Sequence, residues 1–111
     1  MKEIKKVVER YFLTKRMPLT CKGYHNAVEC ITNYIIAKQI NNDIIPATEL
    51  YDKIEQKSRL EKGVVNKRLL DLIKQSWELF PEYFTNRPTP YYFIAKIANE
   101  LDAQIDIPYA V

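Results

Sequence analysis

The chain has 111 residues and a formal net charge of +3, and 47% of its residues are hydrophobic and 28% charged, which is the composition of a globular domain rather than of a disordered chain. This length corresponds to one domain over residues 1–111, large enough to bury a core without disulfides or metals. No stretch approaches the ~18 apolar residues that a membrane helix needs, and the N-terminus lacks the apolar core of a signal peptide, so we expect a cytoplasmic protein with no membrane partner.

Apolar residues at helical spacing predict five helices, and prolines mark most of the joints between them. A further short helix is expected within the aromatic segment 79–87. Because no segment alternates apolar and polar residues, the predicted fold class is all-α, an orthogonal bundle of about five to six helices in a single domain. The five main helices are expected at about residues 2–13, 22–39, 46–57, 61–78 and 89–101.

The third and fourth helices are separated by so few residues that they must cross sharply. This arrangement predicts a helix-turn-helix over about residues 47–77, in which the second helix, Glu61 to Trp77, enters the major groove of DNA. Its inner face is expected to consist of Val65, Leu69, Leu72 and Ser76.

The opposite face of this helix carries Lys67, Leu70, Asp71 and Lys74, with Val64 and Asn66 on its flanks. Lysine can donate to guanine and asparagine can pair with adenine, so Lys67 and Asn66 are the expected base contacts. The cations expected to neutralise phosphates are Lys62, Arg68 and Lys74.

Two other interpretations stay open. The outward face could be an ordinary solvated surface, or it could bind a protein through Leu70, which is apolar and faces outward. An enzyme is not expected, because the sequence shows no paired carboxylates, no nucleophile with a base and no phosphate-binding loop. Cys21, Cys30 and the single His25 form no metal-binding motif, so no metal, cofactor or small-molecule substrate is predicted.

An aromatic cluster follows the fourth helix and is poor in interleaved cations. Such a cluster favours core packing or a subunit contact over stacking on the bases of a single strand. The expected partner interface, in a homodimer or with a related regulator, comprises Leu70, Phe80, Tyr83 and Phe84.

Three stretches of the chain resemble a known family. In the first, Met17 and Pro18 lead into Lys22-Gly23-Tyr24, and Ile31 follows seven residues after Tyr24. The second begins with Leu50-Tyr51, Ile54 and Lys57 and continues without a gap through Val65, Leu69 and Ile73 to Trp77. In the third, Arg87-Pro88-Thr89 precedes Phe93-Ile94-Ala95 and Leu101. Over about residues 15–103 the chain is similar to the C-terminal DNA-binding effector domain of the sporulation-initiating response regulator of spore-forming bacteria, stage zero sporulation protein A.

The resemblance implies a six-helix fold, transcription regulation and head-to-tail pairing on tandem DNA sites. It places Val64, Asn66 and Lys67 at base-contacting positions, where the family has an arginine, a glutamate and a second arginine. Valine cannot make the bidentate contact of arginine with guanine, so an altered sequence preference is expected. Leu60 and Glu61 replace hydroxyl residues able to cap the helix. No counterpart of the family's receiver domain is recognised, so control by phosphorylation of such a domain is not expected within this chain.

Overall fold

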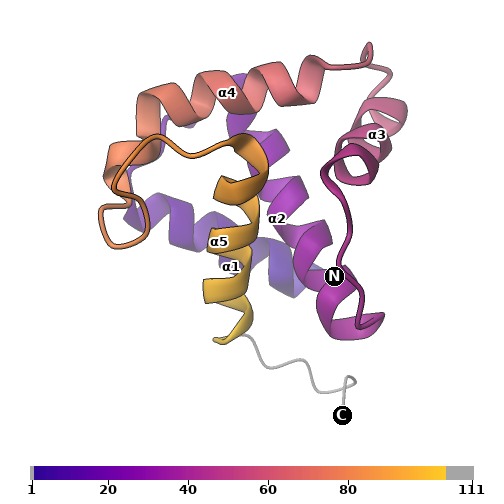
Figure 1. The fold of residues 1–111 in the computed structure, drawn as a ribbon, viewed down its shortest axis with the longest axis horizontal. Helices are drawn as coiled ribbons and strands as arrows, with labels where there is room; N and C mark the ends of the chain where they lie inside the picture. Colours follow the sequence, from indigo (N-terminus) through magenta and orange to yellow (C-terminus); the bar gives the residue numbers. More distant parts are fainter. Residues whose placement is uncertain (1, 105–111) are drawn as a thin grey trace.

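The computed structural model describes residues 2–104, which contain five α-helices and no strand, confirming the all-helical fold class (Figure 1). Residue 1 and residues 105–111 of the predicted domain lie outside the described residues. The helices are α1 (Lys2–Thr14), α2 (Lys22–Ile40), α3 (Ala47–Lys57), α4 (Val64–Ser76) and α5 (Pro90–Asp102), with a 3-10 helix at Trp77–Leu79.

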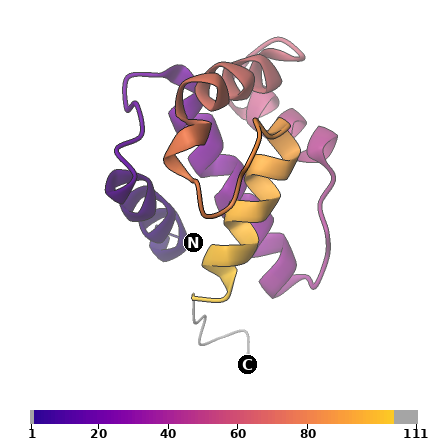
Figure 2. The same cartoon turned by 60° about the vertical axis from the view of Figure 1, so that its left-hand side comes forward.

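The longest helix, α2, lies at the centre and packs against each of the other four α-helices (Figures 1 and 2). Its apolar stripe is fully buried, including Ala27, Cys30, Ile31 and Ile35. The predicted extent of 22–39 and its role as the centre of the core agree with the structure. Opposite it, α1 buries Ile4, Val8 and Phe12 at helical spacing.

Helix α4 runs across one end of the molecule, where it contacts α2 and α5 (Figure 1). Val65, Leu69, Leu72 and Ser76 are buried, as expected for its inner face. The Ser76 hydroxyl donates a hydrogen bond to the Leu72 carbonyl at 2.6 Å, which satisfies a polar group inside the core.

The predicted bounds of this helix were wrong at both ends. It begins at Val64 rather than Glu61, because Gly63 adopts the left-handed backbone conformation with φ of 92° and ends the preceding turn. It ends at Ser76, and the chain then tightens into the 3-10 helix.

The segment 80–89 forms turns and irregular backbone instead of the predicted short helix. Its aromatic side chains anchor it in the core. The ring centroid of Phe80 lies 5.5 Å from that of Phe93 in α5 and 6.2 Å from that of Phe12 in α1, both edge to face. The segment is therefore fixed by tertiary packing rather than by helical hydrogen bonds.

Candidate nucleic-acid interface

The first turn of α4 is capped by a side chain from α3. Glu55 is only 5% exposed, and its Oε2 accepts hydrogen bonds from the backbone N–H groups of Gly63 at 2.9 Å and Val65 at 3.1 Å. A carboxylate at this position satisfies amides that have no partner within the helix and interacts favourably with its dipole. Neither Leu60 nor Glu61 caps α4, because the helix begins three residues after Glu61.

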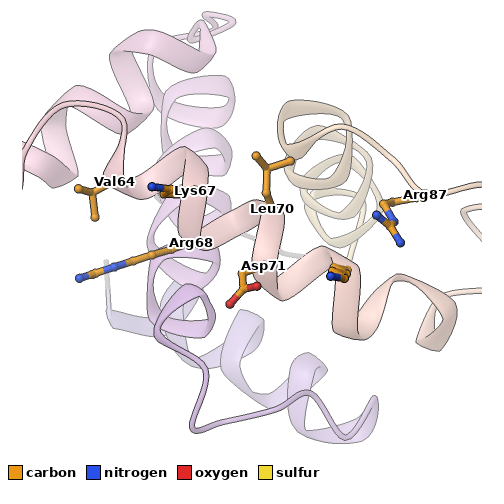
Figure 3. A pocket seen from close by; sticks show the side chains of 7 residues that line it. Val64, Lys67, Arg68, Leu70, Asp71 and Arg87 are labelled. Carbon is orange, nitrogen blue, oxygen red and sulfur yellow. The ribbon is translucent and has the colours of Figure 1, made fainter.

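The outer face of α4 is exposed to solvent as predicted. Asn66, Lys67, Leu70 and Asp71 are exposed, and Val64 is partly buried. Figure 3 shows Leu70 pointing to the side of α4 on which Arg87 lies, whereas Arg68 and Asp71 point to the other side. The helix therefore presents different side chains to its two flanks.

A groove of about 620 Å³ follows this outer face. One wall comes from α4 and the other from Arg87 in the segment before α5 (Figure 3). We call it the Arg87 groove, and its lining residues are Val64, Lys67, Arg68, Leu70, Asp71, Lys74 and Arg87.

A second groove, of about 380 Å³, lies between α4 and the start of α2. It shares Arg68 and Asp71 with the Arg87 groove, and we call it the Lys22 groove. The two helices approach closely here: a Cβ atom on Gly23 would lie 2.2 Å from the Arg68 carbonyl oxygen, so only glycine fits. The lining residues are Thr20, Cys21, Lys22, Gly23, Arg68, Asp71 and Gln75.

The cations around α4 are not neutralised by neighbouring carboxylates. The ion pairs found within residues 2–104 involve other lysines, such as Lys57 with Glu29 and Lys38 with Asp102. The Arg87 groove carries four cations and one carboxylate, that of Asp71. Such a surface attracts anions, and polyanions most strongly. Its cations are Lys67, Arg68, Lys74 and Arg87.

Of the six predicted DNA-contacting residues, four line the Arg87 groove: Val64, Lys67, Arg68 and Lys74. Asn66 is exposed on α4 but is not among the residues that line it. Lys62 lies in the turn before α4, beside the acidic Asp52 and Glu55, rather than in either groove.

Only two of the four residues of the predicted partner interface are accessible to solvent. Leu70 is 47% exposed and Tyr83 is partly exposed, but Phe80 and Phe84 are 0% and 4% exposed. These two rings pack on each other and on Phe93, so their side chains form part of the core and do not offer a surface to a partner.

Two residues that sequence analysis did not assign to the site are Lys22 and Arg87. Lys22 lies 46 positions before Arg68 in the sequence, and Arg87 lies 13 positions after Lys74. Both reach α4 only because the chain folds back, so helical spacing does not reveal them. Within residues 2–104 no group of three or more histidine, cysteine or acidic side chains could hold a metal ion, and no helix there is long and apolar enough to cross a bilayer.

The resemblance to the sporulation-regulator effector domain depends on the sequence motifs within about residues 15–103. No protein-family model, curated protein or solved structure matches the chain.

Proposed function

We propose that the chain binds double-stranded DNA through the outer face of α4, with α3 and α4 acting as a helix-turn-helix, and that it regulates transcription. The observation that carries this proposal is the Arg87 groove, which combines three cations of α4 with Arg87 beside it, none of them with an ion-pair partner in residues 2–104. Phosphate neutralisation by such cations supplies most of the affinity of a DNA-binding protein.

The geometry of α4 suits this role. An α-helix with its side chains is about 10–12 Å across and the major groove of B-DNA is about 12 Å wide. The inner face of α4 is buried and its first turn is capped by Glu55, so the outer side chains are presented by a fixed element. We assign base contacts to Val64, Asn66 and Lys67, and backbone contacts to Arg68 and Lys74.

Titration of random-sequence duplex DNA at several salt concentrations tests the proposal. The logarithm of the binding constant should fall linearly with that of the salt concentration, with a slope of about −0.9 per phosphate neutralised. Lys74→Ala should weaken all sequences similarly and reduce the slope by about one, whereas Lys67→Ala should change which sequences are selected. Lys6→Ala is the matched control, since Lys6 is an exposed lysine of α1 with no ion-pair partner in residues 2–104.

A second candidate function is supported by Leu70. Its side chain is 47% exposed and lines the same groove as Val64, so this face also offers apolar surface to a protein. The titration tests the first candidate: a wild-type chain that shows no salt-dependent binding to duplex DNA would contradict it. The second candidate is tested by Leu70→Glu, which should abolish capture of a protein partner if this face binds one.

A further inference from the structure

The two grooves lie on opposite flanks of α4. Each contains one cation supplied by another part of the chain: Arg87 from the segment before α5, and Lys22 from the first residue of α2. Both side chains are exposed, and neither forms an ion pair within residues 2–104. The exposed helix is therefore bordered by an unneutralised charge on each side.

The backbone that carries each cation is held against the core. Gly23, next to Lys22, approaches the Arg68 carbonyl too closely for any side chain to intervene. On the other flank, Arg87 precedes the buried Pro88 and then Thr89, whose hydroxyl caps α5 by accepting a hydrogen bond from the Tyr92 N–H at 3.3 Å. The fold thus fixes the backbone positions from which both side chains extend.

We infer that Arg87 and Lys22 contact phosphates on opposite strands of the duplex, on the two sides of the major groove that α4 enters. This inference rests on the proposed function and adds the orientation of the protein on DNA. Because an α-helix is about as wide as the major groove, residues on the two sides of an inserted helix meet the two phosphate backbones that line the groove. Arginine can hold a phosphate bidentately, and lysine binds it as a point charge.

The position of Asp71 fits this arrangement. Its carboxylate points to the side of α4 away from Arg87 and, like Arg68, lines both grooves. A carboxylate repels phosphate but can accept a hydrogen bond from the N4 amino group of cytosine. A base edge is therefore a suitable partner for the Asp71 carboxylate, whereas a phosphate is not.

The experiment begins with a duplex selected from a random library by the wild-type chain. Arg87→Ala and Lys22→Ala are compared on it with Arg10→Ala and Lys6→Ala, which remove one exposed charge each from α1. Arg87→Ala and Lys22→Ala should each reduce the steepness of the salt dependence by about 0.9. The affinity lost relative to the wild-type chain is then about eightfold larger at 0.1 M salt than at 1 M salt. The α1 controls should leave the slope unchanged, and circular dichroism checks that all four variants are folded.

Replacement of single phosphates by neutral methylphosphonates then identifies the strand. The affinity of the wild-type chain should fall when a contacted phosphate on either strand is replaced. The affinity of Arg87→Ala should no longer respond to replacements on one of the strands, and that of Lys22→Ala should no longer respond to replacements on the other strand. Loss on the same strand in both variants, or slopes equal to those of the controls, would overturn the flanking contacts while DNA binding itself stands. Absence of salt-dependent binding by the wild-type chain would overturn the proposed function and this inference together.

Discussion

Gly23 determines how closely the first turn of α2 approaches α4. An added Cβ atom would lie 2.2 Å from the Arg68 carbonyl oxygen and 2.9 Å from the Leu72 Cβ. Backbone cannot yield as the tip of a flexible side chain can, so this contact excludes every larger residue. The sequence shows a glycine near the start of a helix, but nothing in it identifies the carbonyl 45 positions later that requires this glycine.

Gly23→Ala should lower the free energy of unfolding by roughly 1–3 kcal/mol, because the extra methyl overpacks the contact between α2 and α4. Urea denaturation followed by circular dichroism measures the change. His25→Ala, an exposed position in the same helical turn, should be close to neutral. Helix propensity alone would make Gly23→Ala as stable as the parent or more stable. That result would contradict the steric explanation.

At the scale of helices, sequence periodicity was sufficient to locate the five α-helices and the inner face of α4, but not the 3-10 helix at Trp77–Leu79. The predicted bounds of α2 and α3 agree with the structure to within one residue. The start of α4 was missed because it depends on two features that spacing does not encode: the left-handed conformation of Gly63 and the cap supplied by Glu55 from another helix.

The same limit applies to the candidate site. Lys67, Leu70 and Lys74 were predicted to share one face because they share one helix, and that face is exposed. Arg87 and Lys22 were not assigned, because their proximity to α4 arises only when distant segments pack together. The inward position of Phe80 was likewise set by rings from α1 and α5.

Glu55→Ala should destabilise the fold by about 1–3 kcal/mol, since it leaves two amides of the α4 start without their acceptor. Glu55→Gln should lose less, because its carbonyl oxygen can still accept these hydrogen bonds without the charge. Chemical denaturation gives both values, and hydrogen exchange at Gly63 and Val65 should accelerate more in the alanine variant. Equal stability of the alanine variant and the parent would show that the cap contributes nothing.

For the molecule as a whole, one buried thiol and two partly buried phenols couple folding to alkaline pH. Burial raises the pKa of the Cys30 thiol to about 12, with a smaller contribution from the charge of Glu29. Burial is also the largest cause that raises the pKa of Tyr11 and of Tyr51 above the ordinary value of 10.0. The folded chain therefore retains protons that the unfolded chain releases.

Stability should accordingly be complete below pH 9 and fall as the pH rises toward 12, since the unfolded state then binds fewer protons than the folded state. Urea denaturation at pH 7, 9 and 11 measures the decline. Tyr51→Phe removes one of these protons and should flatten the decline. A free energy of unfolding that is constant from pH 7 to 11 would contradict the coupling.

The Glu55 cap also has a consequence for how the chain can diverge. Because the carboxylate comes from α3, the side chains between Lys57 and Gly63 are not required as the cap of α4. The buried positions that anchor this helix, such as Val65 and Leu69, are separate from its outward positions, such as Lys67 and Leu70. Mutation can therefore alter the outward side chains while the scaffold keeps its stability.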